Sequence, residues 1–186
     1  YAPKAPGTRN FLNEPETWEL LERIDGLTKE YDMALLPEIH AAYQEKRYET
    51  IAAKGYLTYD FFLPGLLIDA IESRDGTYLA RWAKEQTEKN IRSVNMLGCH
   101  DGIPVLDLEG FLPKERIRAL IDLLVGRGGY VKDLHGSENI YYQVNTTYFN
   151  ALGENESALL IARAIQLFMP GKPQIWYLDL FAGTND

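Results

Sequence analysis

Met33-Ala34-Leu35-Leu36-Pro37-Glu38-Ile39-His40 is an apolar run that ends in a carboxylate and an imidazole. A second run ends in the same way, in Val94-Asn95-Met96-Leu97-Gly98-Cys99-His100-Asp101-Gly102. Unbroken apolar runs of this kind are typical of strands buried in a parallel sheet. Because the active sites of α/β barrels form at the carboxyl ends of parallel strands, the two acidic clusters predict one shared site. Two carboxyl groups that face one cleft favour glycosyl transfer.

The composition sets limits on the partners of this protein. The chain has 186 residues, of which 46% are apolar and 25% charged, enough for one domain with a hydrophobic core. Its net charge of −8 argues against a nucleic-acid groove or an anionic membrane surface as a partner. The single cysteine, Cys99, excludes an internal disulfide and fits a reducing compartment, so we expect a cytoplasmic protein.

Strands and helices are expected to alternate along the chain. The predicted strands are the four short apolar segments Met33 to Pro37, Tyr56 to Phe62, Ile91 to Leu97 and Gln174 to Leu178. The predicted helices are the segments with helical apolar spacing, 13–27, 41–53, 66–71, 77–88, 113–125 and 157–168. Gly126-Arg127-Gly128-Gly129 is expected to stop a helix, and a polar loop is expected to run on to Asn139.

This alternation predicts an α/β fold, with a parallel sheet covered by helices. An eight-stranded barrel typically needs about 250 residues, more than this chain has. Four strands of such a barrel would leave two long unpaired edges, which is unfavourable for a free-standing structure. The sequence is therefore either a small doubly wound domain or part of a larger enzyme.

Several ordered stretches resemble the catalytic (β/α)8 barrel of sucrose phosphorylase and its relatives in the α-amylase superfamily. The matching stretches are Tyr1-Ala2-Pro3-Lys4-Ala5-Pro6-Gly7-Thr8, Leu36-Pro37-Glu38-Ile39-His40, Tyr59-Asp60-Phe61-Phe62-Leu63-Pro64, His100-Asp101-Gly102-Ile103, Tyr142-Gln143-Val144-Asn145-Thr146-Thr147-Tyr148, Pro173-Gln174-Ile175-Trp176-Tyr177 and Ala182-Gly183-Thr184-Asn185-Asp186. The resemblance implies that residues 1–186 are part of one catalytic barrel domain, about its last four β/α units. It also implies that the nucleophile lies upstream of Tyr1 and a small β-domain downstream of Asp186.

The resemblance also implies a chemistry, the retaining transfer of a glucosyl group from an α-glucoside to phosphate through a covalent glucosyl-enzyme. By position, Glu38 matches the general acid/base and Asp101 the residue that stabilises the transition state. His40 and His100 would bind sugar hydroxyls or phosphate. Phosphate would be a co-substrate, and no metal or other cofactor is expected.

Further substrate-binding residues follow from the same resemblance. Tyr142 and Gln143 match a mobile loop on the acceptor side, and Tyr1 and Phe11 match aromatic positions that line the sugar site. Two positions depart from the family pattern. Ile140 stands where the family often has an acidic residue, and Gly98-Cys99 stands where sucrose phosphorylases commonly have Asp-Thr. The donor could therefore be sucrose, sucrose 6′-phosphate or glucosylglycerate.

The residues themselves leave alternatives for this site. Glu38, at the end of a buried strand, would have the raised pKa that an acid catalyst needs, but it could instead be a buried ion-pair partner. Asp101 could stabilise an oxocarbenium-like charge, or it could belong to an ordinary Asp-Gly turn. His40 and His100 could be metal ligands together with the two carboxylates, although their spacing matches no zinc motif. Cys99 and His100 are sequence neighbours on opposite faces of a strand, so they do not form a catalytic dyad.

The partners expected from the sequence are a small sugar substrate, phosphate and the remainder of the same enzyme. A hydrolase or transglucosidase on the same scaffold would use the same two carboxylates. A non-catalytic carbohydrate-binding protein is a third alternative, from a different class. Because both Glu38 and Asp101 are present, we expect an enzyme when the barrel is complete.

Overall fold

The computed structural model describes residues 15–133 and 141–186, and the chain divides into two compact units, Tyr1–Leu36 and Pro37–Asp186. In the first unit, helix α1 spans Glu16–Lys29, directly after Pro15, close to the predicted start. Acidic residues in its first turn and Lys29 in its last turn complement the helix dipole.

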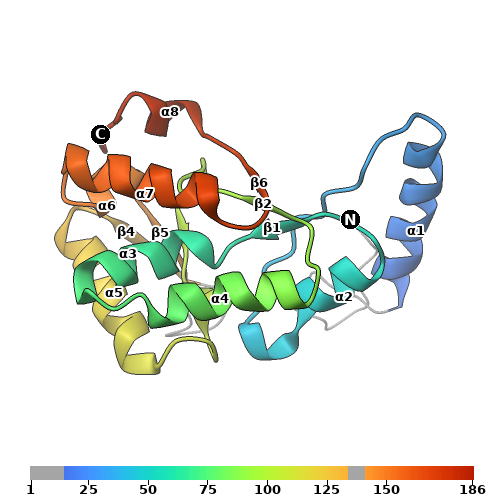
Figure 1. Ribbon diagram of the computed structural model, residues 1–186, viewed down its shortest axis with the longest axis horizontal. Coiled ribbons are helices and arrows are strands. Elements are labelled where there is room, and N and C mark those ends of the chain that lie inside the picture. Colours follow the sequence, from blue (N-terminus) through green and yellow to red (C-terminus); the bar gives the residue numbers. More distant parts are fainter. Residues whose placement is uncertain (1–14, 134–140) are drawn as a thin grey trace. The chain divides into compact units, whose positions relative to one another are not determined.

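The second unit contains all the other elements (Figure 1). Its strands are β1 (Thr58–Asp60), β2 (Ser93–Asn95), β3 (Ile103–Pro104), β4 (Tyr130–Asp133), β5 (Tyr141–Asn145) and β6 (Lys172–Pro173). Its α-helices are α2 (Arg47–Ala53), α3 (Leu63–Ser73), α4 (Thr77–Glu88), α5 (Lys114–Gly126), α6 (Tyr148–Ala151), α7 (Glu156–Phe168) and α8 (Tyr177–Leu180). Two short 3-10 helices, η1 (Tyr43–Glu45) and η2 (Leu106–Leu108), complete it.

A parallel sheet with the strand order β1-β2-β6 forms the frame of this unit. Thr58 pairs with Ser93, and Val94 pairs with Lys172. Helices α3 and α4 connect β1 to β2, and α7 lies on the connection from β2 to β6, so the unit is built of β/α repeats. This confirms the predicted α/β class. Within residues 15–133 and 141–186 the parallel sheet is open, so the chain does not close a barrel.

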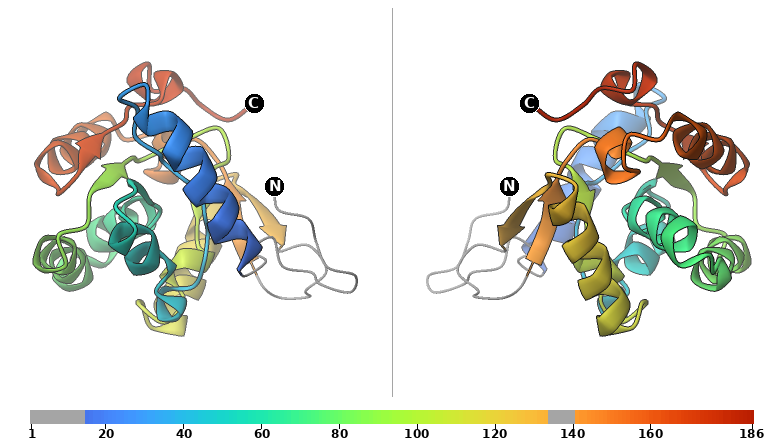
Figure 2. Two further views of the ribbon diagram at one scale, coloured as in Figure 1. Left: turned by 90° about the vertical axis from the view of Figure 1, so that its right-hand side faces the viewer. Right: turned by 90° about the vertical axis from the view of Figure 1, so that its left-hand side faces the viewer.

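A second, antiparallel sheet with the order β3-β5-β4 was not predicted. Strand β4 lies where the sequence predicted a polar loop, and its residues Tyr130 to Lys132 pair with Asn145 to Gln143 of β5. Helix α5 packs along β4 and β5 (Figure 2). The sheet escaped prediction because β3 and β4 are too short to show a clear alternation of apolar and polar residues.

The core lies between the parallel sheet and its helices and continues beneath the antiparallel sheet. Aromatic rings fill one end of it, where Phe62 stacks on Trp82 at a centroid distance of 4.2 Å. Polar side chains are buried there as well, among them Asp60, which accepts hydrogen bonds from the backbone N–H groups of Phe62 and Leu63 at the start of α3. These two hydrogen bonds to the buried carboxylate fix the direction in which the chain leaves β1.

Two of the four predicted strands are wrong. Met33 to Pro37 forms no ladder among the described residues, and Met33 is 60% exposed. The apolar run Gln174 to Leu178 is not a strand either, because the ladder to β2 ends near Gln174 and α8 begins at Tyr177. A short apolar run cannot by itself decide between strand, helix and extended segment, because that depends on whether a neighbouring strand is present.

Candidate active site

The Glu38–His40 segment packs against residues from three other parts of the second unit. The His40 ring stacks on Phe61, just after β1, at a centroid distance of 3.7 Å. The edge of the ring meets Tyr142 of β5 at 4.9 Å. Its Nδ1 lies 3.0 Å from Asp107 Oδ2, and its Nε2 lies 3.9 Å from Glu38 Oε1. The predicted acid and histidine are therefore neighbours in space as well as in sequence.

The His100–Gly102 loop after β2 carries the second predicted carboxylate. Asp101 Oδ2 lies 3.4 Å from His100 Nε2. The Gln143 side-chain amide donates a hydrogen bond to the Asp101 backbone carbonyl, which ties this loop to β5. Gly102 has a φ of +98°, and a Cβ at this position would lie 2.5 Å from the Val144 carbonyl oxygen. Only glycine allows the loop to approach β5 so closely.

The two predicted carboxylates share a neighbour, the Tyr142 phenol. Burial raises the pKa of Tyr142 well above its ordinary value, and the negative charges of Asp107, Asp101 and Glu38 raise it further. Burial likewise raises the pKa of Tyr59, in the middle of β1, and the Glu38 charge adds to this shift. Glu38 and Asp101 therefore lie at the same end of the parallel sheet, around one tyrosine.

This end of the unit is open to solvent. The side chains of Glu38, Asp101 and His100 are 53%, 41% and 78% exposed, respectively. The sequence led us to expect a partly dry cleft around Glu38. Among the described residues that enclosure is missing, so the desolvation that suits an acid catalyst is not supplied by this part of the structure.

The two histidines do not share a metal site with both carboxylates. His40 lies beside Glu38 and Asp107, whereas His100 lies beside Asp101. In the described part of the chain, one trio of potential ligand atoms, from Cys99, His100 and Asp101, lies within 4.8 Å of one another. Cys99 and His100 lie beyond the end of β2, so the prediction that they occupy opposite faces of a strand is wrong. Burial raises the pKa of the Cys99 thiol, which opposes the thiolate that a metal needs.

Sequence reasoning missed two residues at this site, Asp107 and Phe61. Asp107 lies on η2 and its side chain is 4% exposed. The available signal was a lone acid in the apolar stretch Val105-Leu106-Asp107-Leu108, because a buried carboxylate requires a partner. Of the predicted site residues, Tyr1 and Phe11 lie outside the described residues, as does Ile140.

The second unit has a parallel α/β fold with a polar cluster at the carboxyl ends of its strands, the place where enzymes of this fold class carry their active sites. Comparison with known proteins identifies the family. The whole chain is 53% identical to a sucrose 6(F)-phosphate phosphorylase of Ilumatobacter coccineus and 36% identical to a glucosylglycerol phosphorylase of Marinobacter adhaerens. It is 35% identical to a sucrose phosphorylase of Streptococcus mutans. The chain therefore belongs to the family of sucrose phosphorylases and related glucoside phosphorylases.

Structural comparison supports the same assignment. The crystal structure of a sucrose 6F-phosphate phosphorylase from Thermoanaerobacter thermosaccharolyticum matches 99% of this chain with a TM-score of 0.89 and 37% identity. The chain spans 37% of that structure and 37–39% of the relatives named above. No family model matches the sequence. In the described part of the chain, no helix is both long and apolar enough to cross a membrane.

Proposed function

We propose that the full-length protein transfers a glucosyl group with retention, by reversible phosphorolysis of an α-glucoside to α-D-glucose 1-phosphate. The single observation that carries this proposal is that Glu38 and Asp101, the two carboxylates matched by position, both lie near the Tyr142 phenol. Similarity to glucoside phosphorylases along the whole chain supports it.

In the proposed reaction Glu38 serves both half-reactions. As a carboxylic acid it donates its proton to the glycosidic oxygen while the bond from that oxygen to C1 breaks. An aspartate upstream of Tyr1 forms a bond to C1, which gives the covalent glucosyl-enzyme. A phosphate oxygen then attacks C1 and displaces the aspartate, while the Glu38 carboxylate takes up the phosphate proton. Asp101 stabilises the positive charge that develops on the ring in both steps.

The proposed acceptor side is formed by the residues around His40. Tyr142 of β5, together with His40 and His100, offers hydrogen-bonding groups to the leaving group or to phosphate. Gln143 was expected in a loop on the acceptor side, but it is buried in β5 and its amide donates to the Asp101 carbonyl and to Asn145 Oδ1, so we propose that it supports the Asp101 loop. We place Tyr1 and Phe11 at the glucosyl group by family position alone. Phosphate takes part as a co-substrate, and the proposed chemistry requires no separate cofactor.

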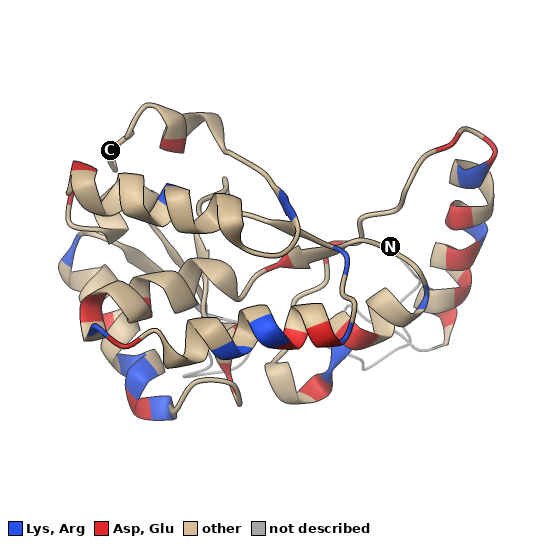
Figure 3. Cartoon of the chain, in the orientation of Figure 1, with Lys and Arg blue, Asp and Glu red and all other residues tan. Residues whose placement is uncertain are grey.

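We further propose that the chain is part of one (β/α)8 barrel domain that further segments of the full-length protein complete. Helices α7 and α8 support this, because their exposed faces are apolar. Figure 3 shows few charged residues on α7 and many on α4 and α5. The large exposed apolar residues of α7 are Leu160, Ile161, Leu167 and Phe168. In α8 and just after it they are Tyr177, Leu180 and Phe181. Faces of this kind are normally covered.

Among the α-glucosides, we propose sucrose 6(F)-phosphate as the donor. The support is the 53% identity to a sucrose 6(F)-phosphate phosphorylase, compared with 36% and 35% for phosphorylases named for glucosylglycerol and sucrose. Sucrose, glucosylglycerol and glucosylglycerate are the donors to compare with it.

The test is the release of glucose 1-phosphate by the full-length protein from these four donors, with and without inorganic phosphate. We expect phosphate-dependent release, fastest from sucrose 6(F)-phosphate. In Glu38→Gln this release should fall by about 10²- to 10⁴-fold, the range for loss of a general acid. Glu88→Gln, at an exposed position at the end of α4, is the matched control and should retain activity. Release of free glucose alone would identify a hydrolase, and no turnover of any donor would refute the proposal.

A further inference from the structure

Asp107 connects two segments that lie far apart in the sequence. Its Oδ2 lies 3.0 Å from His40 Nδ1, and its Oδ1 accepts a hydrogen bond from the Ala41 backbone N–H at 3.3 Å. One buried carboxylate therefore contacts both the His40 side chain and the backbone that follows it. These two hydrogen bonds explain why an acidic side chain can be buried in this apolar environment.

We propose that Asp107 is a positioning residue of the active site, which fixes the orientation and the proton of the His40 imidazole beside Glu38. The proposal rests on the proposed function for its catalytic consequence. A carboxylate only accepts hydrogen bonds, so the contact at 3.0 Å requires a proton on His40 Nδ1. In the neutral ring, Nε2 then carries the lone pair.

The surroundings of His40 leave one ring nitrogen for a substrate. Phe61 covers a face of the ring, with an angle of 23° between the two planes, and Tyr142 meets its edge. A ring flip would replace Nδ1 by a carbon and leave Asp107 without its partner. Nε2 therefore stays on the side of Glu38, 3.9 Å from Oε1. This distance is too long for a hydrogen bond, so Nε2 can still form a hydrogen bond with a substrate group.

His40 held in this way has two uses in the proposed reaction. A neutral ring accepts a hydrogen bond from a sugar hydroxyl through the Nε2 lone pair. A protonated ring donates from Nε2 to an anionic phosphate oxygen, and the Asp107 carboxylate stabilises that positive charge. In both cases Asp107 acts through His40 and does not touch the substrate.

The first test is the nitrogen NMR spectrum of histidine-labelled full-length protein, with His40 assigned by its loss in His40→Gln. We expect the wild-type His40 signals of the tautomer with the proton on Nδ1. The opposite tautomer in the wild-type protein would overturn the proposal without any Asp107 variant. This measurement does not depend on turnover.

The second test compares Asp107→Asn with Asp69→Asn. Both residues are buried aspartates that pair with a cation or imidazole, but Asp69 pairs with Arg116 and is not a neighbour of His40. Because a carboxamide can donate as well as accept, Asp107→Asn should change the tautomer signals and lower kcat by about 10²-fold. Asp69→Asn should leave the His40 signals and kcat within about twofold of wild type.

Two outcomes separate this proposal from the proposed function. If Asp107→Asn only lowers the unfolding temperature, with unchanged His40 signals and kcat, the residue is structural and the positioning role is wrong. If the wild-type protein forms no glucose 1-phosphate but the His40 signals still change in Asp107→Asn, the proposed function fails and the positioning of His40 by Asp107 stands.

Discussion

Asp60 shows how one buried residue organises its surroundings. Besides the two backbone N–H groups at the start of α3, its carboxylate accepts hydrogen bonds from Trp82 Nε1 and Gln86 Nε2 of α4, each at 3.0 Å. The carboxylate joins the end of β1 to both following helices. Burial raises the pKa of Asp60 from 3.8 to about 6, although the four donors oppose this shift.

This pKa predicts a pH-dependent contribution to stability. Because the folded-state pKa is raised, the folded protein binds the proton more tightly than the unfolded chain. The resulting stabilisation is complete below pH 3.8 and is lost as the pH rises through about 6. Asp60→Asn cannot ionise and should lack this loss. We expect the unfolding temperature of Asp60→Asn, relative to wild type, to be higher at pH 7.5 than at pH 4.5. If the difference in unfolding temperature between Asp60→Asn and wild type does not vary with pH, the raised pKa of Asp60 is contradicted.

Gly98 is the second residue whose identity the packing dictates. A Cβ at this position would lie 2.6 Å from Asp179 Oδ1, and Arg163 holds this buried carboxylate at 3.2 Å. Gly98→Ala should therefore lower the free energy of unfolding by about 1–3 kcal/mol, as overpacking does. The matched control is Gly126→Ala, where a Cβ meets nothing within 4 Å. Chemical denaturation of both variants checks this prediction, and equal stabilities would contradict it.

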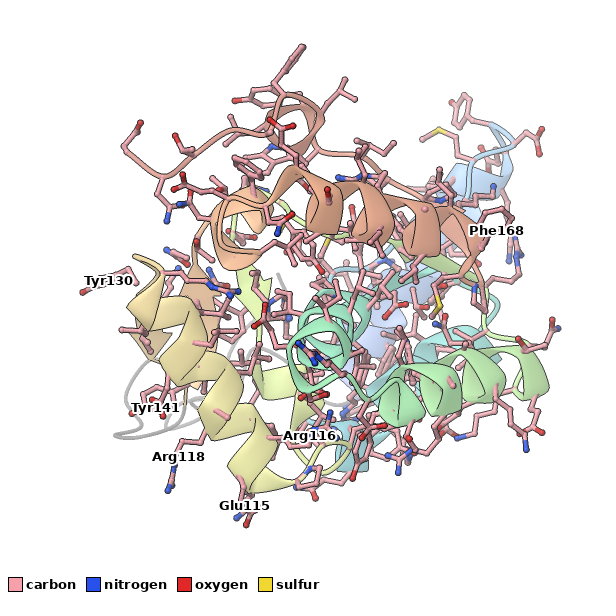
Figure 4. All side chains as sticks on the ribbon, turned by 60° about the vertical axis from the view of Figure 1, so that its left-hand side comes forward. Glu115, Arg116, Arg118, Tyr130, Tyr141 and Phe168 are labelled. Carbon is pink, nitrogen blue, oxygen red and sulfur yellow. The ribbon has the colours of Figure 1, made fainter. Side chains whose placement is uncertain are left out.

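At the scale of elements, Arg116 fastens α5 to α3. Its guanidinium donates to both Asp69 carboxylate oxygens, at 2.9 and 2.6 Å, and to Asp75 at 2.7 Å. Figure 4 shows Arg116 directed into the molecule, whereas Glu115 and Arg118 of the same helix project outward. These contacts of Arg116 with Asp69 and Asp75, here called the clamp, connect α5, which packs along β4 and β5, to α3, which follows β1.

Loss of the clamp should destabilise the second unit. Arg116→Met leaves the Asp69 carboxylate, at 8% exposure, without its cation, and we expect a loss of about 2–4 kcal/mol in the free energy of unfolding. Adding Asp69→Asn to this variant should recover part of the loss, because the unpaired buried charge is removed. Denaturant titration of the single and double variants measures the coupling. Strictly additive losses would show that the two residues do not interact.

At the scale of the whole molecule, the exposed apolar faces of α7 and α8 predict a larger assembly of β/α units. Phe168 is 92% exposed in this chain and projects outward from the end of α7 (Figure 4). If further segments of the full-length protein cover it, Phe168→Ala in that protein should cost about 3 kcal/mol, as for a buried ring. Thermal or chemical unfolding of the full-length variant checks this. A change below about 0.5 kcal/mol would mean that Phe168 stays at a surface.

The sequence by itself determined the α/β class and the position of the longer helices, but not the short helices α6 and α8. Helical apolar spacing predicted α4 with both its ends correct, and the predicted stop at Gly126 is the last residue of α5. Local signals sufficed here because helix hydrogen bonds and caps join residues close in sequence. The acid–histidine pairs were also visible, because each lies within one short segment.

Tertiary structure alone decided the strand ladders and the partner of His40. Strand pairing joins distant residues, so the run at Met33 and the run at Gln174 could not be assigned from their own composition. Asp107 follows His40 by 67 positions, and its contact depends on how η2 packs beneath the site. The sequence pattern indicates which side chains are buried. Which buried groups meet is decided only when the chain has folded.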